Sequence, residues 1–320
     1  MSFLVLGTLL AVLAFGAASA VGSFVAAMAW WALRGRIEKL APARRARFIL
    51  TLRLLPSFTS IVFTVVFFIP AFVLHEPRDT VEVTSATMVA AALLAAALLL
   101  RGPIATFVAW RRTRQLVQGW LAGAEPIALE APVPTVLVEL PFPVVAVVGV
   151  CRPRIVVARS VKEACSEEEL KAVLEHETAH LKRGDNFTRH LVRGAPDLLT
   201  WTNLGSLLER EWSEATEEAA DRCAGAALAI PLASALVKVA RLAVGTSPLP
   251  ALETALYRQS GLARRIGYLT GIPKPCESSF VRATPWPFFA ASIALVIAAT
   301  PSGWLHRLHT FTELVVALLQ

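Results

Sequence analysis

Charged residues are scarce in this chain of 320 amino acids, where aspartate, glutamate, lysine and arginine together make up 17%. The mean hydropathy is +0.58, which is too apolar for a soluble protein of this length unless much of the chain lies in lipid. These two values argue against a water-soluble class of protein. We therefore expect a membrane protein that has the lipid bilayer as its main surroundings.

Cysteine is sparse as well, and acidic residues are outnumbered by basic ones. No two cysteines form a C-x-x-C pair, which argues against a cysteine zinc site and a dithiol redox motif. The net charge of +7 comes mostly from residues 34–53 and 101–114, directly beside long apolar runs. Basic clusters in that position are typical of topology signals, so we expect no direct nucleic-acid binding. We expect free thiols in a reducing compartment at Cys151, Cys165, Cys223 and Cys276.

Four apolar segments could cross a membrane as helices. The first, residues 3–33, would be about 45 Å long, which exceeds the ~30 Å thickness of the hydrocarbon core. A cleaved signal peptide is the alternative, but no basic residue precedes this run, and it continues beyond the small residues that resemble a cleavage site. The other spans are predicted at about 54–74, at 86–100 extended by 104–108, and at 286–299.

The charges of the connecting loops predict how these spans are oriented. A basic loop at about 34–53 is rich in arginine, whereas residues 75–85 contain a single one, Arg78. Because cytoplasmic loops carry the excess of lysine and arginine, the first loop should face the cytoplasm and the N-terminus the outside. We therefore expect a multi-pass protein of the plasma (inner) membrane.

The spans divide the chain into three parts. Residues 1–110 would hold three transmembrane helices, and residues 285–320 a fourth helix with a short external tail. Residues 111–284 would lie on the cytoplasmic side and are numerous enough for one globular domain. Valine-rich segments separated by prolines predict a small sheet in that domain, at residues 135–140, 144–150 and 154–158.

A helix is predicted to begin shortly after this sheet. Ser166 and Glu169 have the spacing of a capping box, in which each side chain accepts a hydrogen bond from the other residue's backbone amide. Gly184 follows two basic residues and is a suitable end for the helix.

The predicted helix carries an H-E-x-x-H motif at residues 176–180. Two histidines four residues apart project from the same face of a helix, so both imidazoles can reach one metal ion. Glu177 lies beside the first histidine, where its carboxylate can take a proton from a water activated by the metal. With six histidines in the chain, a chance match has a probability of about one in a hundred. The motif predicts a zinc site with His176 and His180 as ligands and Glu177 as the catalytic base.

A catalytic zinc site also needs a third protein ligand. The metzincin arrangement is excluded, because Asn186 stands where its third histidine would lie. His190 is an alternative, although its position favours the surface of the next helix. Glu217 can bind the metal while Asp221, one helical turn further on, accepts the outer N–H of a ligand histidine. Spacing alone leaves three acidic residues nearly equal, because any solvated helix face can carry them: Glu214, Glu217 and Glu218.

Three elements of the chain resemble the M56 peptidases, a family that includes the antibiotic-sensing membrane proteases of the BlaR and MecR type. They are the segment 148–157, the stretch 167–185 with its H-E-x-x-H motif, and an E-x-x-x-D element at 217–221. The resemblance covers roughly residues 130–270. It implies an α-helical membrane protein with an inserted α+β, zincin-like (gluzincin) metalloprotease domain that uses Zn²⁺. It also implies that Glu217 is the third ligand, since M56 shares this element with the M48 membrane proteases.

The chain departs from the family pattern at three places. Thr178 stands where the family usually has an aliphatic residue, and Gly184 replaces a common basic residue. Receptors of the BlaR type continue after their last span into an extracellular penicillin-binding domain, for which this chain has no room. We therefore expect no recognition of β-lactams.

The expected function is zinc-dependent endopeptidase activity in signal transduction, with Glu177 acting first as base and then as proton donor. The resemblance implies a protein substrate such as a cytoplasmic transcriptional repressor. Because proteases commonly hold their substrates extended, we expect the substrate strand to pair with an exposed edge of the sheet. Self-cleavage is a further expectation, at Arg264-Arg265 in a segment expected to be exposed. Two alternatives are an M48-like protease for membrane-protein quality control and a non-catalytic signalling protein. No oligomeric state and no oxyanion-stabilising residue is assigned.

Overall fold

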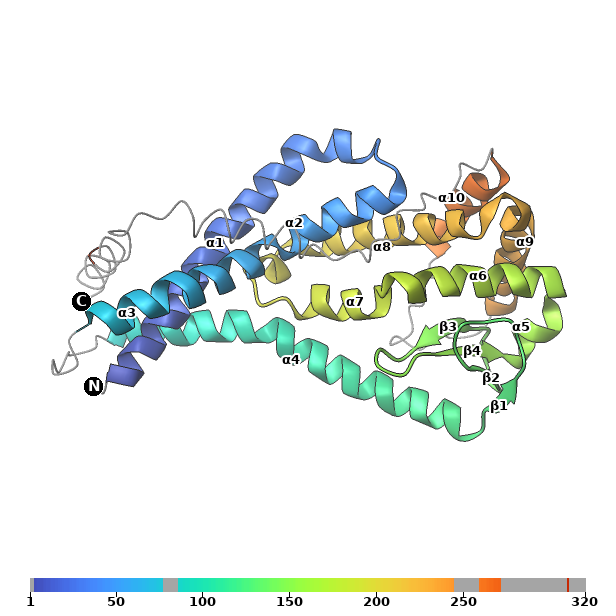
Figure 1. Ribbon diagram of the computed structural model, residues 1–320, viewed down its shortest axis with the longest axis horizontal. Helices are drawn as coiled ribbons and strands as arrows, with labels where there is room; N and C mark the ends of the chain where they lie inside the picture. Colours follow the sequence, from blue (N-terminus) through green and yellow to red (C-terminus); the bar gives the residue numbers. More distant parts are fainter. Residues whose placement is uncertain (1–2, 77–85, 245–258, 272–309, 311–320) are drawn as a thin grey trace.

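The computed structural model describes residues 3–76, 86–244, 259–271 and 310. Three long helical runs lie in Figure 1 beside a group of shorter helices and strands. These runs are long and apolar enough to cross a membrane by length and composition. The fourth predicted span, at 286–299, lies outside the described residues. The three runs consist of α1 (Phe3–Ile37), α2 (Pro42–Val62) with a π-helical stretch (Phe63–Phe68) and α3 (Ile69–His75), and α4 (Ala86–Ala122).

Two helices extend further than the sequence suggested. Residues 42–53 were expected in a basic loop but form the first turns of α2. Pro42 suits the first turn of a helix. The arginines Arg45 and Arg53 that follow pair with acidic residues elsewhere in the protein. Helix α4 continues through Pro103, in agreement with the extension of the third span to 104–108, and past the expected domain boundary at residue 111. A single proline removes one backbone donor, which a long helix can tolerate.

A four-stranded mixed sheet follows α4. The strand order is β1-β2-β4-β3, with β2 and β4 parallel and the two outer pairs antiparallel. The three valine-rich segments are confirmed as strands. The first strand was not predicted, because it is three residues long and contains proline, which strands accept at an edge. The strands are β1 (Glu125–Ile127), β2 (Thr135–Val138), β3 (Val145–Val148) and β4 (Arg154–Ala158).

The helix that carries the H-E-x-x-H motif begins and ends where the sequence predicts. The Ser166 hydroxyl accepts from the Glu169 amide, and the Glu169 carboxylate accepts from the Ser166 amide at 2.7 Å. Gly184 ends the helix with a φ of 70°, a left-handed conformation that favours glycine. The helices after the sheet are α5 (Arg159–Ala164), α6 (Glu167–Arg183), α7 (Asp185–Gly194), a 3₁₀ turn (Leu198–Trp201), α8 (Asn203–Cys223), α9 (Gly225–Ala243) and α10 (Gln259–Thr270).

Two hydrophobic cores hold these elements together. The first lies between the sheet, α6 and α9 and includes Val157, Val173 and Leu236. The second is shared, because Ile49 and Leu50 of α2 pack with residues of α7 and α8, among them Val192, Leu208 and Trp212. Gly102 of α4 also lies against the backbone after α7, where an added Cβ would be 2.9 Å from the Ala195 carbonyl oxygen. Helices α7 and α8 are therefore packed directly on the apolar helices.

The capping residue Glu169 ties the start of α6 to α9. Its buried carboxylate accepts hydrogen bonds from Ser234 (2.6 Å) and Lys238 (2.7 Å). Burial alone would raise the pKa of Glu169, but these hydrogen bonds and the one from Ser166 lower it to about 2. We expect Glu169→Gln to lower the free energy of unfolding by ~1–3 kcal/mol, because the bonds that the charge strengthens are weakened.

The effect should depend on pH in a defined direction. Because the pKa of Glu169 is lowered in the folded protein, its charge stabilises the fold fully at pH values above the ordinary pKa of 4.5. This stabilisation is lost as the pH falls towards about 2. Thermal unfolding of the detergent-solubilised protein at several pH values measures it. Glu168→Gln is the matched control, because Glu168 is exposed on the same turn. Equal acid sensitivity of the wild type and Glu169→Gln would contradict the prediction.

Candidate metal centre

Helix α6 presents two histidines to one point. The Nε2 atoms of His176 and His180 are 3.1 Å apart. The His176 side chain is fully buried and that of His180 is 12% exposed. As the spacing predicts, the two imidazoles lie on the same face of the helix, one turn apart.

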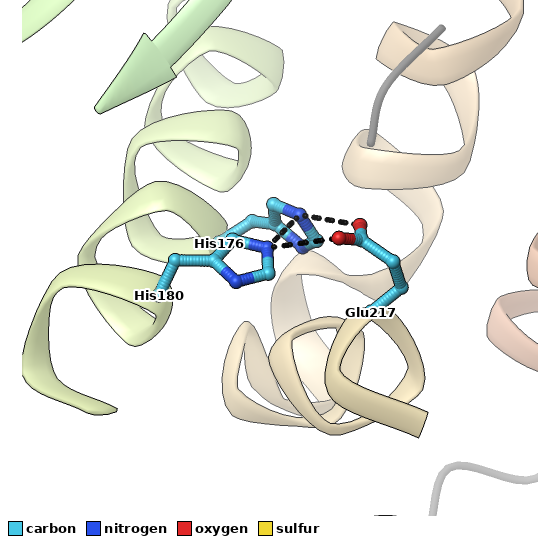
Figure 2. Close-up of side chains that lie close together, drawn as sticks. All are labelled: His176, His180 and Glu217. Atoms are coloured by element: carbon cyan, nitrogen blue, oxygen red, sulfur yellow. Dashed lines mark hydrogen bonds and ion pairs between the residues drawn. The ribbon is translucent and has the colours of Figure 1, made fainter. Parts of the chain in front are cut away.

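Helix α8 brings Glu217 to the same point. Its two carboxylate oxygens lie 3.5 Å from the Nε2 atoms of His176 and His180. The potential ligand atoms of the three residues all lie within 4.8 Å of one another. Figure 2 shows the two imidazoles of one helix and the carboxylate of another pointing toward a common centre. His190 is half-buried on α7 and is not part of this group.

The donor set fits a metal ion. Both oxygens of the Glu217 carboxylate are buried, and neither has a hydrogen-bond partner among the residues that the structure describes. A buried polar atom without a partner is costly, and a buried carboxylate more so. Two imidazoles and one carboxylate are ligands that zinc accepts, and the set leaves a fourth position for water or substrate. A divalent cation at this point would bind the Glu217 oxygens, which receive no hydrogen bond from the described residues.

The surrounding charges also fit a divalent cation. Four carboxylates are buried around the group, and two guanidinium groups lie among them. With both imidazoles neutral and all four carboxylates ionised, an excess of two negative charges remains. Isolated buried charges are expensive, so such an excess calls for a compensating cation. The charged residues are Glu177, Asp185, Glu217 and Asp221 with Arg183 and Arg265.

Each histidine has a carboxylate at its outer nitrogen. Asp221 Oδ1 is 3.0 Å from His176 Nδ1, as the sequence suggested, although the two groups are not aligned as a hydrogen bond. Asp185 Oδ2 is 2.6 Å from His180 Nδ1 and was not assigned a role from the sequence. Carboxylates in this position fix the orientation of a metal-binding imidazole. The left-handed turn at Gly184 places Asp185 beside His180. The glycine that directly precedes Asp185 is the signal in the sequence that could have indicated this position.

The proposed catalytic base lies beside the two histidines. The Glu177 carboxylate is 6% exposed and accepts a hydrogen bond of 3.1 Å from the backbone amide of Val147. Val147 belongs to β3, an edge strand of the sheet, and its carbonyl accepts 2.9 Å from the Asn186 side chain. The base is thus placed between the histidine pair and the edge of the sheet.

Comparison with known proteins adds a family to this geometry. The family model described as BlaR1 peptidase M56 matches residues 71–269, which is more than half of the chain and includes every residue of the centre. The chain belongs to the M56 peptidase family. A comparison with the curated proteins found no match. The resemblance noted in the sequence is therefore confirmed, and the family is one of proteases.

The electrostatics of the centre in this M56 peptidase favour a proton-transfer role for Glu177. Burial raises the pKa of Glu177, and the charge of Glu217 raises it further, although the two histidines and the Val147 amide act in the opposite direction. A carboxyl group with a raised pKa is a better proton acceptor near neutral pH than an ordinary glutamate. Glu177 therefore has the environment that a general base requires.

His180 and Glu217 form a strongly coupled pair. Burial alone would lower the pKa of His180, but the charge of Glu217 and the hydrogen bond with Asp185 raise it to about 10. Burial alone would raise the pKa of Glu217, but the neighbouring histidines hold it well below its usual range. A ligand imidazole must be neutral, so a metal ion bound here would replace the proton that this pair otherwise attracts. The M56 peptidase thus has an environment at this group that favours a cation.

The expected self-cleavage site is exposed only in part. Arg265 lies inside α10, and only 5% of the residue is exposed, because its guanidinium group binds Asp221 of the metal centre. Arg264 remains half-exposed and pairs with Glu214 at 2.5 Å. A peptidase would have to unwind α10 and remove Arg265 from the centre before it could cut between them. The expectation of an exposed site therefore holds for Arg264 and is wrong for Arg265.

Proposed function

We propose that this M56 peptidase is a membrane-embedded zinc metalloendopeptidase. The observation that carries the proposal is the buried group of His176, His180 and Glu217 next to the carboxylate of Glu177. The two oxygens of Glu217 have no hydrogen-bond partner among the described residues. Zinc is favoured because two histidines and a carboxylate with an open position make up a common catalytic zinc site. The proposal includes the zincin-like (gluzincin) fold class that the sequence resemblance implies.

The residues of the chain divide the work of peptide hydrolysis. Bound zinc would act as a Lewis acid that polarises the scissile carbonyl and makes water more acidic. Glu177 takes a proton from that water, which attacks the carbonyl carbon, and later gives the proton to the leaving amine nitrogen. Asp185 and Asp221 keep the imidazoles of His180 and His176 in place through their outer nitrogens.

An extended substrate is proposed to lie along β3. This strand is at an edge of the sheet, and the Val147 amide bonds directly to the catalytic carboxylate. Backbone pairing with an edge strand is a common way for proteins to hold an extended peptide. A substrate at this position has to compete with Glu177 and Asn186 for the backbone groups of Val147.

The proposed setting is a signalling protease of the plasma membrane. The three apolar helices support a membrane protein, and the basic residues around α2 favour a cytoplasmic location for the metal centre that packs against it. The proposed substrate is a cytoplasmic or membrane protein, with a transcriptional repressor as the specific candidate.

Mapping of new protein N-termini by mass spectrometry tests the proposal. Native-host cells that express the wild type are compared with cells that express Glu177→Ala, which should keep the zinc but lack the base. We expect fragments that appear only with the wild type. A single DNA-binding substrate would support signalling, and a broad set of substrates would indicate quality control instead. No difference under several envelope stresses would favour a non-catalytic membrane protein and overturn the proposed activity.

A further inference from the structure

One buried guanidinium group reaches the metal centre from outside the three elements that carry the family resemblance. Helix α10 packs against α8 and α9 and is the orange helix beside them in Figure 1. Within α10, the side chain of Arg265 is 6% exposed, whereas that of its neighbour Arg264 is 53% exposed. The two arginines therefore face different surroundings although they are adjacent in sequence.

Arg265 binds both acidic residues that α8 contributes to the centre. Its Nε and Nη2 atoms donate to the two oxygens of Asp221 at 2.8 and 2.6 Å. Its remaining terminal nitrogen, Nη1, lies 3.4 Å from Glu217 Oε2. Glu217 and Asp221 are one helical turn apart, so a single planar group spans the interval between them. The same Asp221 oxygen that accepts from Nη2 lies 3.0 Å from His176 Nδ1.

These contacts fix three parts of the centre at once. The two-pronged bond determines the rotation of the Asp221 carboxylate, and the orientation of that carboxylate determines the position of the His176 ring. The contact with Glu217 limits the movement of a carboxylate that accepts no hydrogen bond from the described part of the chain. A guanidinium group is suited to this task because its donors are arranged in a rigid plane, unlike the single ammonium of lysine.

We infer that Arg265 is a positioning residue of the metal centre, which holds Asp221 and Glu217 in the geometry that lets His176 and Glu217 bind the ion. This inference rests on the proposed zinc site and deepens it. It also gives α10 a role in the site, because a shift of this helix would move the guanidinium away from both carboxylates.

An electrostatic argument points in the opposite direction and makes the inference testable. A positive charge close to the ligands opposes the binding of a second cation, so removal of Arg265 would strengthen zinc binding if charge alone mattered. If positioning dominates, removal should weaken zinc binding by about 10–100-fold, as is common for outer partners of metal ligands. The two views differ in the sign of the change.

The test measures metal affinity of the purified full-length protein in detergent. Zinc affinity is determined by competition with a chelator for the wild type, Arg265→Gln, Arg265→Lys and the matched control Arg264→Gln. We expect weaker zinc binding for Arg265→Gln, no full recovery with Arg265→Lys, and wild-type affinity for Arg264→Gln. The absorption spectrum of the cobalt-substituted protein should change in both Arg265 variants, because the ligand geometry changes.

The outcomes separate the inference from the proposed function. Wild-type zinc affinity and an unchanged cobalt spectrum in Arg265→Gln, or tighter binding, would overturn the positioning role while leaving the zinc site in place. Full recovery by Arg265→Lys would overturn it as well, since charge would then suffice. If Arg265→Gln does not fold, the zinc affinity and the cobalt spectrum of Arg265→Lys decide between the two views. Failure of the wild type to bind zinc or cobalt would overturn the proposed zinc site and this inference together.

Discussion

Glu217→Gln is expected to abolish zinc binding and proteolysis while the protein remains folded. The amide is neutral and offers a single acceptor oxygen, whereas the carboxylate places two buried oxygens beside the histidine pair. Without the ion, Glu177 has no acidified water from which to take a proton. The loss of activity should therefore be at least the roughly 10²–10⁴-fold that a positioned base contributes.

Zinc content by plasma mass spectrometry and the rate of substrate cleavage measure the two effects separately. Glu214→Gln is the matched control, because Glu214 lies on the same helix but pairs with Arg264 instead of the centre. It should keep its zinc. Zinc that is retained in Glu217→Gln and lost in Glu214→Gln would show that the third ligand has been assigned to the wrong residue. Comparison with Glu177→Ala then distinguishes loss of the ion from loss of the base.

The acidic residues of α8 illustrate what a sequence can indicate about this site and what it cannot. Spacing leaves Glu214, Glu217 and Glu218 nearly equal, because all three lie on one helix of unknown rotation. In the structure their nearest partners lie on three different elements. Glu214 pairs with Arg264 of α10, Glu218 pairs with Arg45 of α2, and Glu217 faces the histidines of α6. Only the packing of α8 between these helices separates them.

Local patterns predicted the elements that depend on neighbouring residues. The capping box at Ser166, the left-handed end at Gly184 and the pairing of His176 with His180 all involve residues within five positions of one another. Contacts across long stretches of chain could not be predicted in this way. Arg265 meets His176 and Asp221 from positions 89 and 44 residues away.

The apolar spans show the same limit. Hydropathy located three of them, but the helix that contains the second span begins at Pro42, before the apolar run. The first turns of α2 carry arginines whose partners are carboxylates far along the chain, including Glu218 and Asp197. A hydropathy profile counts such arginines as loop residues, because it contains no information about the partners that allow a charged side chain to be buried in a helix.

The second large effect is expected where α2 meets the segment after α7. Arg53 of α2 and Asp197 are 3% and 1% exposed, and Arg53 Nη1 donates to Asp197 Oδ2 at 2.7 Å. Arg53 also donates to the Val192 carbonyl at 2.9 Å, and the Ser57 hydroxyl donates to Asp197 at 2.6 Å. Asp197→Ala would leave the arginine charge buried without its partner. We expect it to lower the free energy of unfolding by about 3–5 kcal/mol.

A paired replacement separates the loss of a partner from the value of the ion pair itself. In Arg53→Met combined with Asp197→Leu, neither charge remains, so the double variant should be clearly more stable than Asp197→Ala. Thermal unfolding in detergent or in lipid nanodiscs measures all three proteins. A double variant as unstable as the single one would show that the damage comes from lost packing or from Ser57 and Val192.

Helix α7 runs from Asp185, the partner of His180, to Gly194, three residues before Asp197. The ion pair therefore anchors to α2 the helix that begins at the metal centre, and the stable variants can also be tested for zinc affinity.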